Sequence, residues 1–516
     1  MLELQFQWTT SKFFYKVLMR QNVQLCSHLW FSYCVRGFQA FLAFAKNASN
    51  YLHFVAAVRK FLFAKYYPRL MDSGSPYQWI RELRLEDSNT LNPFDLLYEC
   101  AKFVASGSIK NADIALEYIS HQLSPDGAAA QRTVTYFSEA LASKIVKNLP
   151  GVDKALNSSK RLTASEEILV QNYFYELFPF LKCAYLTANQ VIVKAMEGER
   201  VVHIIDLHCA EPVQWINLLM TLNDRPEGPP HLRITSIHDK KEVLDQMNSS
   251  LTREAEKLDF PLQFNPIVST LEDLDIDRLP VRTGEALAIC SVLQLHRLLA
   301  TDDEVLGRNS PAASMNLHRA VHMNRRTFAE WLERDMMNSY ISSPNSALSP
   351  PPLYPSPKME AFLRDIRKLQ PKLMVITEQE TNLNGCSLVE RVEKALYFYS
   401  ALFDCLDSTV RRTSLERKKV ESLLLGEQIK NIIASEGFER KERYEKLENW
   451  IRRLDMAGFV RLPLRDNDKL HAKEVLHNYG HKYMIREGHG CLLVCWGDRP
   501  LFSISAWSFR GLNLSL

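Results

Sequence analysis

The chain has 516 residues, of which 63 are Lys or Arg and 60 are Asp or Glu, so its formal net charge is +3. This even balance excludes a strongly basic nucleic-acid-binding domain and a charge-rich disordered chain. With 46% hydrophobic and 24% charged residues, the composition predicts a globular protein of two or three structural units. The ten cysteines follow no secretory signal, which predicts reduced thiols and no disulfides.

Residues 1–70 differ in composition from everything that follows them. They hold nine Lys or Arg, one acid (Glu3) and seventeen aromatic residues, so they carry +8, whereas residues 71–516 carry −5. They lack the Ser-rich and Arg-rich composition of a transit peptide. A membrane-surface helix is the weaker alternative, because these residues show no sustained amphipathic period. We expect a dispensable extension with Met71 as the natural start, and no transmembrane helix.

The next part of the chain is predicted to be a helical bundle. From Asn92 to Leu149, apolar residues recur at helical spacing. Asn92-Pro93 opens the first helix as the N-cap and first helical residue, and Ser106-Gly107 closes it. A further single helical stretch is predicted over Glu166–Met196.

The pattern then changes to short apolar runs that alternate with helical stretches. Runs that lack polar alternation suit strands buried on both faces, and their alternation with helices is typical of right-handed βαβ crossovers. We therefore predict an α/β fold with a doubly wound, mostly parallel sheet, in which the run that contains Pro266 lies at an edge. The predicted strands are Val201–Ile205, Leu232–Ile237, Leu262–Ile267, Ala286–Val292 and Leu373–Thr377, and the predicted helices are Val213–Leu222, Lys240–Leu258, Met359–Leu369 and Leu388–Leu406.

Three features punctuate and follow this core. The proline-rich stretch Ser342–Pro357 is predicted to be a mobile loop and a phosphorylation site. Ser414–Leu454 is predicted to be helical, and we interpret its basic clusters, which alternate with Glu, as solvated helix faces. Cys491–Trp496 and Leu501–Trp507, joined by a Gly-Asp-Arg-Pro turn, predict a C-terminal β-hairpin.

The loop after the first predicted strand, Asp206–Pro212, is where an open α/β sheet would place a cofactor. It contains no glycine, although a dinucleotide or S-adenosylmethionine site needs the backbone to approach the ligand closely. Pro212 removes a donor, and Glu211 would place an anion at the start of the helix. We interpret the loop as internal packing and predict no cofactor and no catalytic residue.

Two other patterns favour packing over chemistry. Cys491 and Cys495 point the same way on one predicted strand, and we expect burial, with no metal site there or among the histidines around the sheet. Leu295, Leu298 and Leu299 form an LxxLL sequence. Such a sequence on a helix can dock in a partner's groove, but core packing is the preferred interpretation.

Two short sequences are signatures of a known family. Val202-His203-Ile204-Ile205-Asp206 reads VHIID and Ser505-Ala506-Trp507 reads SAW, both letter for letter, so the chain resembles the plant GRAS proteins. The family's scattered PFYRE signature is resembled by Pro371, Phe398, Tyr399, Arg440 and Glu442, although Lys441 separates the last two.

The resemblance implies a GRAS domain over residues 75–508, with a methyltransferase-like, Rossmann-type sheet and an N-terminal helical cap. The sequence around Trp496 is similar to the scarecrow-like protein 3 branch. The implied regions are leucine-rich region I with the cap (92–152), the VHIID region (171–236), leucine-rich region II (252–284), the PFYRE region (293–430, with the loop 342–357) and the SAW region (434–508).

The resemblance also implies a nuclear transcriptional regulator, with gibberellin-linked control of plant growth and development at the level of the branch. Its expected partners are other transcription factors, including DNA-binding proteins and other GRAS proteins, with no membrane or metal. The −5 charge of residues 71–516 favours indirect contact with DNA, because affinity for DNA depends on neutralising phosphates. The alternative is an S-adenosylmethionine-dependent methyltransferase on the same fold.

The motif residues are expected to serve the fold and a partner surface, without catalysis. Asp206 should accept hydrogen bonds from the turn that follows it. His203 should be a neutral, buried imidazole bonded to a backbone carbonyl. Trp496 and Trp507 should anchor the C-terminal hairpin.

Overall fold

The computed structural model describes residues 92–121, 124, 126–147, 162–208, 211–300, 353–385, 387–464 and 466–509. The N-terminal extension and most of the proline-rich loop 342–357 lie outside these residues, so the predictions made for them stay predictions. Within the described ranges, no helix is both long enough and apolar enough to cross a membrane.

One mixed sheet organises the described residues. Its order is β3-β2-β1-β4-β5-β9-β8-β7, with β6 pairing β9 off this path. Strands β1 to β5 are parallel, whereas β9 is antiparallel to β5, β6 and β8. The strands are β1 (Val201–Asp206), β2 (His231–His238), β3 (Leu262–Val268), β4 (Ala286–Val292), β5 (Leu373–Gln379), β6 (Phe459–Leu462), β7 (Tyr483–Gly488), β8 (Cys491–Trp496) and β9 (Arg499–Phe509).

This topology confirms the doubly wound, mostly parallel sheet and the edge position of β3. The predicted hairpin is confirmed as β8 and β9, but the antiparallel part of the sheet is larger than a hairpin. The sequence pattern missed β6 because it is only four residues long. It missed β7 because that strand carries Arg486 and Glu487 beside its apolar residues.

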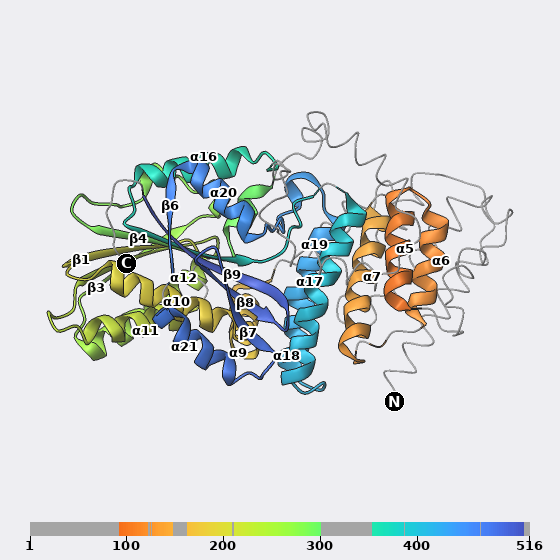
Figure 1. The fold of residues 1–516 in the computed structure, drawn as a ribbon, viewed down its shortest axis with the longest axis horizontal. Helices are drawn as coiled ribbons and strands as arrows, with labels where there is room; N and C mark the ends of the chain where they lie inside the picture. Colours follow the sequence, from red (N-terminus) through yellow and green to blue (C-terminus); the bar gives the residue numbers. More distant parts are fainter. Residues whose placement is uncertain are drawn as a thin grey trace, which may run out of the picture. The chain divides into compact units, whose positions relative to one another are not determined.

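Helices cover both faces of the sheet (Figure 1). On one face lie α10 (Phe180–Ala195), α11 (Pro212–Asn223) and α12 (Lys241–Leu258), with α9 (Ala164–Leu177) and α21 (Asp466–His477) packed against them. On the other face lie α16 (Pro357–Lys368) and α20 (Leu447–Ala457).

The single helix predicted over Glu166–Met196 is wrong, because the structure has two helices there. Phe178 adopts an extended conformation between α9 and α10, with φ −122° and ψ 145°. Pro179 follows it, and a proline disfavours helical geometry in the residue before it. The break turns the chain from the helical region toward the sheet.

The predicted helical bundle is confirmed, but two distant stretches build it (Figure 1). Asn92 caps the first helix as predicted, since its Oδ1 accepts a hydrogen bond from the Phe94 amide at 3.0 Å. The helices α5 (Pro93–Ala105) and α7 (Ala129–Lys147) pack against α17 (Leu388–Thr409), and α7 also packs against α19 (Gly426–Ala434). Helix α6 (Ile109–Ser120) packs against α5 and α7, and α18 (Leu415–Val420) joins α19 through a π-helical turn, Glu421–Leu425.

The interpretation of the basic clusters as solvated helix faces is wrong for part of each cluster. Arg417, Arg440 and Arg443 are fully buried, and residues 440–446 are not helical. The Arg440 guanidinium donates to the Leu383 carbonyl at 2.9 Å, and Arg417 pairs with Glu421 at 2.8 Å. Arginine and glutamate near each other in sequence cannot reveal whether their partners lie across the core or in water.

Candidate functional site

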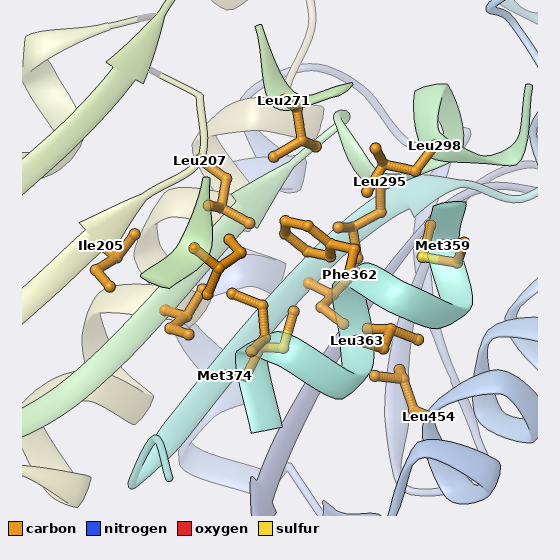
Figure 2. Packing of buried hydrophobic residues seen from close by; sticks show 14 of the residues in the cluster. Ile205, Leu207, Leu271, Leu295, Leu298, Met359, Phe362, Leu363, Met374 and Leu454 are labelled. Atoms are coloured by element: carbon orange, nitrogen blue, oxygen red, sulfur yellow. The ribbon is translucent and has the colours of Figure 1, made fainter. Parts of the chain in front are cut away.

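Residues from two of the family motifs lie in one hydrophobic cluster between the sheet and the helices α16 and α20. Ile205 of the VHIID sequence and Trp507 of the SAW sequence belong to it. Figure 2 shows Ile205 near Leu207 and Met374, with Leu295 and Leu298 of the LxxLL sequence facing Phe362. Three sequence features that lie far apart in the chain therefore contribute to a single core.

The LxxLL sequence is buried, which confirms core packing, but it does not form an α-helix. Leu295–Leu299 is a 3-10 helix (η3), and Leu293 just before it has a φ of 55°. The Glu378 carboxylate of β5 accepts a hydrogen bond from the Leu295 amide at 2.8 Å. This buried acceptor holds the start of η3 and explains the tight turn after β4.

Asp206 lies at the carboxyl end of β1 and accepts three hydrogen bonds. Its Oδ1 accepts from the His208 amide at 3.0 Å, which confirms the predicted bond to the following turn. Its Oδ2 accepts from Trp215 Nε1 at 2.9 Å and from Ser236 Oγ at 3.4 Å. Burial raises the pKa of Asp206 to about 7, although these bonds favour the charged form. One carboxyl thus ties β1 to α11 and β2.

His203 is fully buried in β1. Burial and the nearby Arg233 lower its pKa to about 4, so the imidazole is neutral at neutral pH as expected. The expected backbone carbonyl partner is wrong: Nε2 lies 2.9 Å from Thr235 Oγ1, and Nδ1 lies 3.1 Å from a Glu285 carboxylate oxygen. The partners are therefore side chains, one from β2 and one from the residue that precedes β4.

Glu211 lies at the start of α11, and the expectation that it places an anion there is wrong. Its side chain is buried, and burial together with Glu176 raises the pKa of Glu211 to about 8. The carboxyl is therefore mainly protonated at neutral pH. A hollow beside it has a volume of about 10 Å³ and is lined by Ile168, Glu211, Pro212, Val243, Gln246 and Met247. That volume is about the size of one water molecule.

A buried charged cluster was not found from the sequence. His296 lies within η3, and its Nδ1 is 2.9 Å from Glu378 Oε2 while its Nε2 is 3.5 Å from Glu442 Oε2. The His296 and Tyr444 rings lie 4.2 Å apart. Burial alone would lower the pKa of His296, but the two carboxylates outweigh burial and raise it to about 9. His296 is therefore a buried cation.

Only one member of this cluster, Glu442 of the PFYRE signature, was a predicted site residue. His296 stands inside the LxxLL sequence and Glu378 at the end of a predicted strand, but 82 residues separate them. The available signal was the pairing of β4 with β5, which brings the residues that follow β4 to the end of β5. A polar residue at each of those two strand ends was a reason to expect a contact.

The remaining predicted residues are structural. Trp496 Nε1 donates to Asp404 at 2.7 Å, and Trp507 Nε1 donates to Ser505 Oγ at 2.9 Å, so both indoles are buried with their polar atom satisfied, as anchors should be. Cys491 and Cys495 are buried as predicted, and burial raises the pKa of their thiols to about 11 and about 12.

The expectation of a partner surface is wrong for nearly all the motif side chains. Glu442 is part-exposed, with 20% of its side-chain surface accessible. The others are buried: Val202, His203, Ile204, Ile205, Asp206, Leu295, Leu298, Leu299, Pro371, Phe398, Tyr399, Arg440, Trp496, Ser505, Ala506 and Trp507. The buried motif side chains therefore hold elements of the fold together.

Comparisons with known proteins agree with the motifs. Residues 94–508 match the GRAS domain family. The chain is 66% identical over 440 residues to GRAS family protein TF80 of Medicago truncatula, across 85% of this chain and 100% of that protein. It is 50% identical over 453 residues to Scarecrow-like protein 3 of Arabidopsis thaliana, across 86% of this chain and 94% of that protein.

A solved structure supports the fold. The crystal structure of SCL7 from Oryza sativa superposes on this chain with a TM-score of 0.62 at 25% sequence identity, and the match covers 81% of this chain and 100% of that chain. The α/β sheet with its helices is therefore an architecture already seen by crystallography.

Proposed function

Because the chain belongs to the plant GRAS family, in its scarecrow-like protein 3 branch, we propose that it is a nuclear transcriptional coregulator that works mainly through protein partners. The observation that carries the proposal is the family match over residues 94–508. Relatives that match over this length are named as GRAS and scarecrow-like proteins and not as enzymes.

The distribution of charge supports protein partners over direct contact with DNA. Residues 71–516 carry −5, and burial removes more positive than negative charge from the surface. Among the described residues, eight basic side chains are buried against five acidic ones. The buried basic residues are Arg132, Arg233, Arg391, Arg417, Arg440, Arg443, Arg453 and Lys469. Side chains held inside the fold cannot neutralise the phosphates of DNA. Neutralisation of phosphates is the main source of affinity for DNA.

The methyltransferase alternative gains no support from the end of β1. S-adenosylmethionine needs a cavity of several hundred Å³, roughly 300 or more for a ligand of that size, and the hollow beside Glu211 measures about 10 Å³. Trp215 and the Asp206 carboxyl are engaged with each other there. We therefore propose no catalytic residue and no cofactor.

The partners that fit this role are DNA-binding transcription factors and other GRAS proteins, which would bring the chain to promoters. Gibberellin-linked control of growth is the pathway that the scarecrow-like protein 3 branch suggests. Both statements rest on the family and the branch, and on the charge that disfavours direct binding to DNA.

Two measurements test the proposal. Purified chain titrated with fluorescent promoter DNA at physiological salt should bind no more tightly than about 10⁻⁶ M, the nonspecific range. The same chain fused to an unrelated DNA-binding domain should change the output of a reporter gene that carries that domain's site. Sequence-specific affinity near 10⁻⁸ M or tighter by the chain alone, or a silent fusion that is folded and nuclear, would defeat the coregulator proposal.

A further inference from the structure

The turn between α17 and α18 carries a charged sequence pattern around a serine. It reads Arg411-Arg412-Thr413-Ser414-Leu415. Two arginines stand three and two residues ahead of a serine, and an apolar residue follows it. Serine kinases with acidic substrate clefts select substrates by this arrangement of charges. The segment lies far in the sequence from the proline-rich loop 342–357.

The structure leaves this pattern accessible. Arg411, Arg412 and Thr413 are exposed, and none of residues 410–414 is helical. Leu415 is 68% exposed although it is apolar, so packing gives no reason for a leucine there. A segment that is already non-helical and exposed needs little local opening to enter an enzyme cleft.

Ser414 is held only by contacts of its own turn. Its hydroxyl donates to Glu416 Oε2 at 2.7 Å and accepts from the Arg417 amide at 3.1 Å. Its side chain is half-buried. Unwinding the first residues of α18 would free the hydroxyl, because Leu415 and Glu416 are both exposed.

We propose that Ser414 is a phosphorylation site for an arginine-directed serine kinase. Ser414 Oγ attacks the γ-phosphorus of ATP, the new O–P bond forms as the bond to the β-phosphate oxygen breaks, ADP leaves, and the hydroxyl proton passes to the kinase's base. Arg411 and Arg412 supply the charges that the kinase's acidic cleft recognises, and Leu415 supplies the apolar contact after the serine.

The structure also shows what the phosphate would disturb. Phosphoserine carries roughly −1.5 to −2 charges at neutral pH, so it repels Glu416 and loses the hydrogen bond that the hydroxyl donates. Arg412 lies two residues away and now pairs with Asp407 at 3.2 Å. Because phosphate is the stronger partner for a guanidinium, Arg412 moves from Asp407 to phosphoserine 414.

That movement reaches the helical bundle. Asp407 also accepts from Arg132 of α7 at 2.9 Å, and Arg132 pairs with Glu421 at 2.9 Å. Arg417 shares Glu421 and donates to the Arg412 carbonyl. Phosphorylation at one exposed turn therefore changes the charges around a buried link between α7 and α18.

The test uses the full chain with ATP and the catalytic subunit of cyclic-AMP-dependent protein kinase, an arginine-directed probe. We expect phosphate at Ser414, located by tandem mass spectrometry, and its loss in Ser414→Ala. Arg411→Ala, which changes an exposed side chain, should lower kcat/KM about tenfold, the factor for one charge-assisted contact. Ser408→Ala, at an exposed serine without preceding arginines, is the matched control and should change nothing.

Several results would overturn the proposal. Equal incorporation into Ser414→Ala and the unchanged chain would place the phosphate elsewhere. A synthetic peptide of residues 409–419 that is phosphorylated while the folded chain is not would show that the fold withholds the serine. Hydrogen exchange gives a further readout: amides of residues 411–418 should exchange differently after phosphorylation, and unchanged exchange there would contradict the movement of Arg412.

Discussion

Asp206 and Glu378 are two buried carboxyls at the carboxyl ends of parallel strands, and the fold accommodates them in opposite ways. Asp206 ends β1 and accepts bonds from neutral donors, so burial raises its pKa to about 7. Glu378 near the end of β5 pairs with His296, whose pKa the acids raise to about 9. The first carboxyl is stabilised largely by losing its charge, and the second by gaining a partner of opposite charge.

The difference teaches that position on a sheet does not determine how a polar group is satisfied. Both acids face elements that follow a strand, but Asp206 finds donors within its own turn, in α11 and in β2, whereas Glu378 receives a cation from η3. Five expected outcomes can break or sharpen this contrast.

The largest effect is expected in the core that both sites share. Trp507→Ala empties a fully buried indole site and should lower the free energy of unfolding by about 3–5 kcal/mol. Urea denaturation measures it. Met456→Ala is the control, because Met456 is 78% exposed and its loss should cost less than about 0.5 kcal/mol. A Trp507 variant of unchanged stability that no longer binds partners would identify an exposed contact instead of an anchor.

His296→Gln should cost about 3 kcal/mol at neutral pH, because it leaves the buried Glu378 carboxylate without its cation. The folded pKa of His296 is raised, so its contribution is complete below about 6.5, the unfolded value, and is lost as pH rises through about 9. The difference in stability between the unchanged chain and His296→Gln should therefore shrink across that window.

Glu378→Gln tests the same pair from the other side. Glu378→Gln leaves the buried His296 cation without this carboxylate. The double variant should lower the free energy of unfolding by less than the sum of the two single changes. Costs that simply add would show that His296 and Glu378 are satisfied independently, which the 2.9 Å distance between them argues against.

Asp206→Ala should cost about 1–3 kcal/mol, because the Trp215 indole and the His208 amide each lose a buried acceptor. The folded pKa of Asp206 is also raised, so the unchanged chain should lose stability as pH rises from about 4 to about 7, where the unfolded chain has already released its proton. The variant lacks this loss. Near-ultraviolet circular dichroism should report a changed environment for Trp215, and an unchanged spectrum would contradict the proposed link.

The smallest effect is expected for removal of the N-terminal extension. A chain that begins at Met71 should melt cooperatively within about 2 °C of the full chain, since the helical pattern begins at Asn92. A chain that begins at Ser108 is the control: it lacks α5, which packs against α6, α7 and α17, and should melt lower. A large loss of stability or solubility in the Met71 chain would show that the extension is needed.

Sequence reasoning recovered the parallel sheet because β1 and β4 are short apolar runs buried on both faces, and β5 begins as one. It recovered Asp206 because the acid that ends a strand and the turn that it caps are neighbours in the chain. It missed the His296–Glu378 pair because that contact depends on which strands become neighbours. The same limit explains Arg417 and Arg440, which look solvated in sequence and are fully buried in the fold.

The central claim is that the VHIID and SAW residues act through the fold, with no catalytic step. The most direct test measures melting temperature, partner binding and transcriptional output on the same Asp206→Ala protein. The account predicts that stability and partner binding fall together and that output falls with them. Full stability and intact partner binding with abolished output would contradict it, and would point to chemistry at the Asp206 carboxyl.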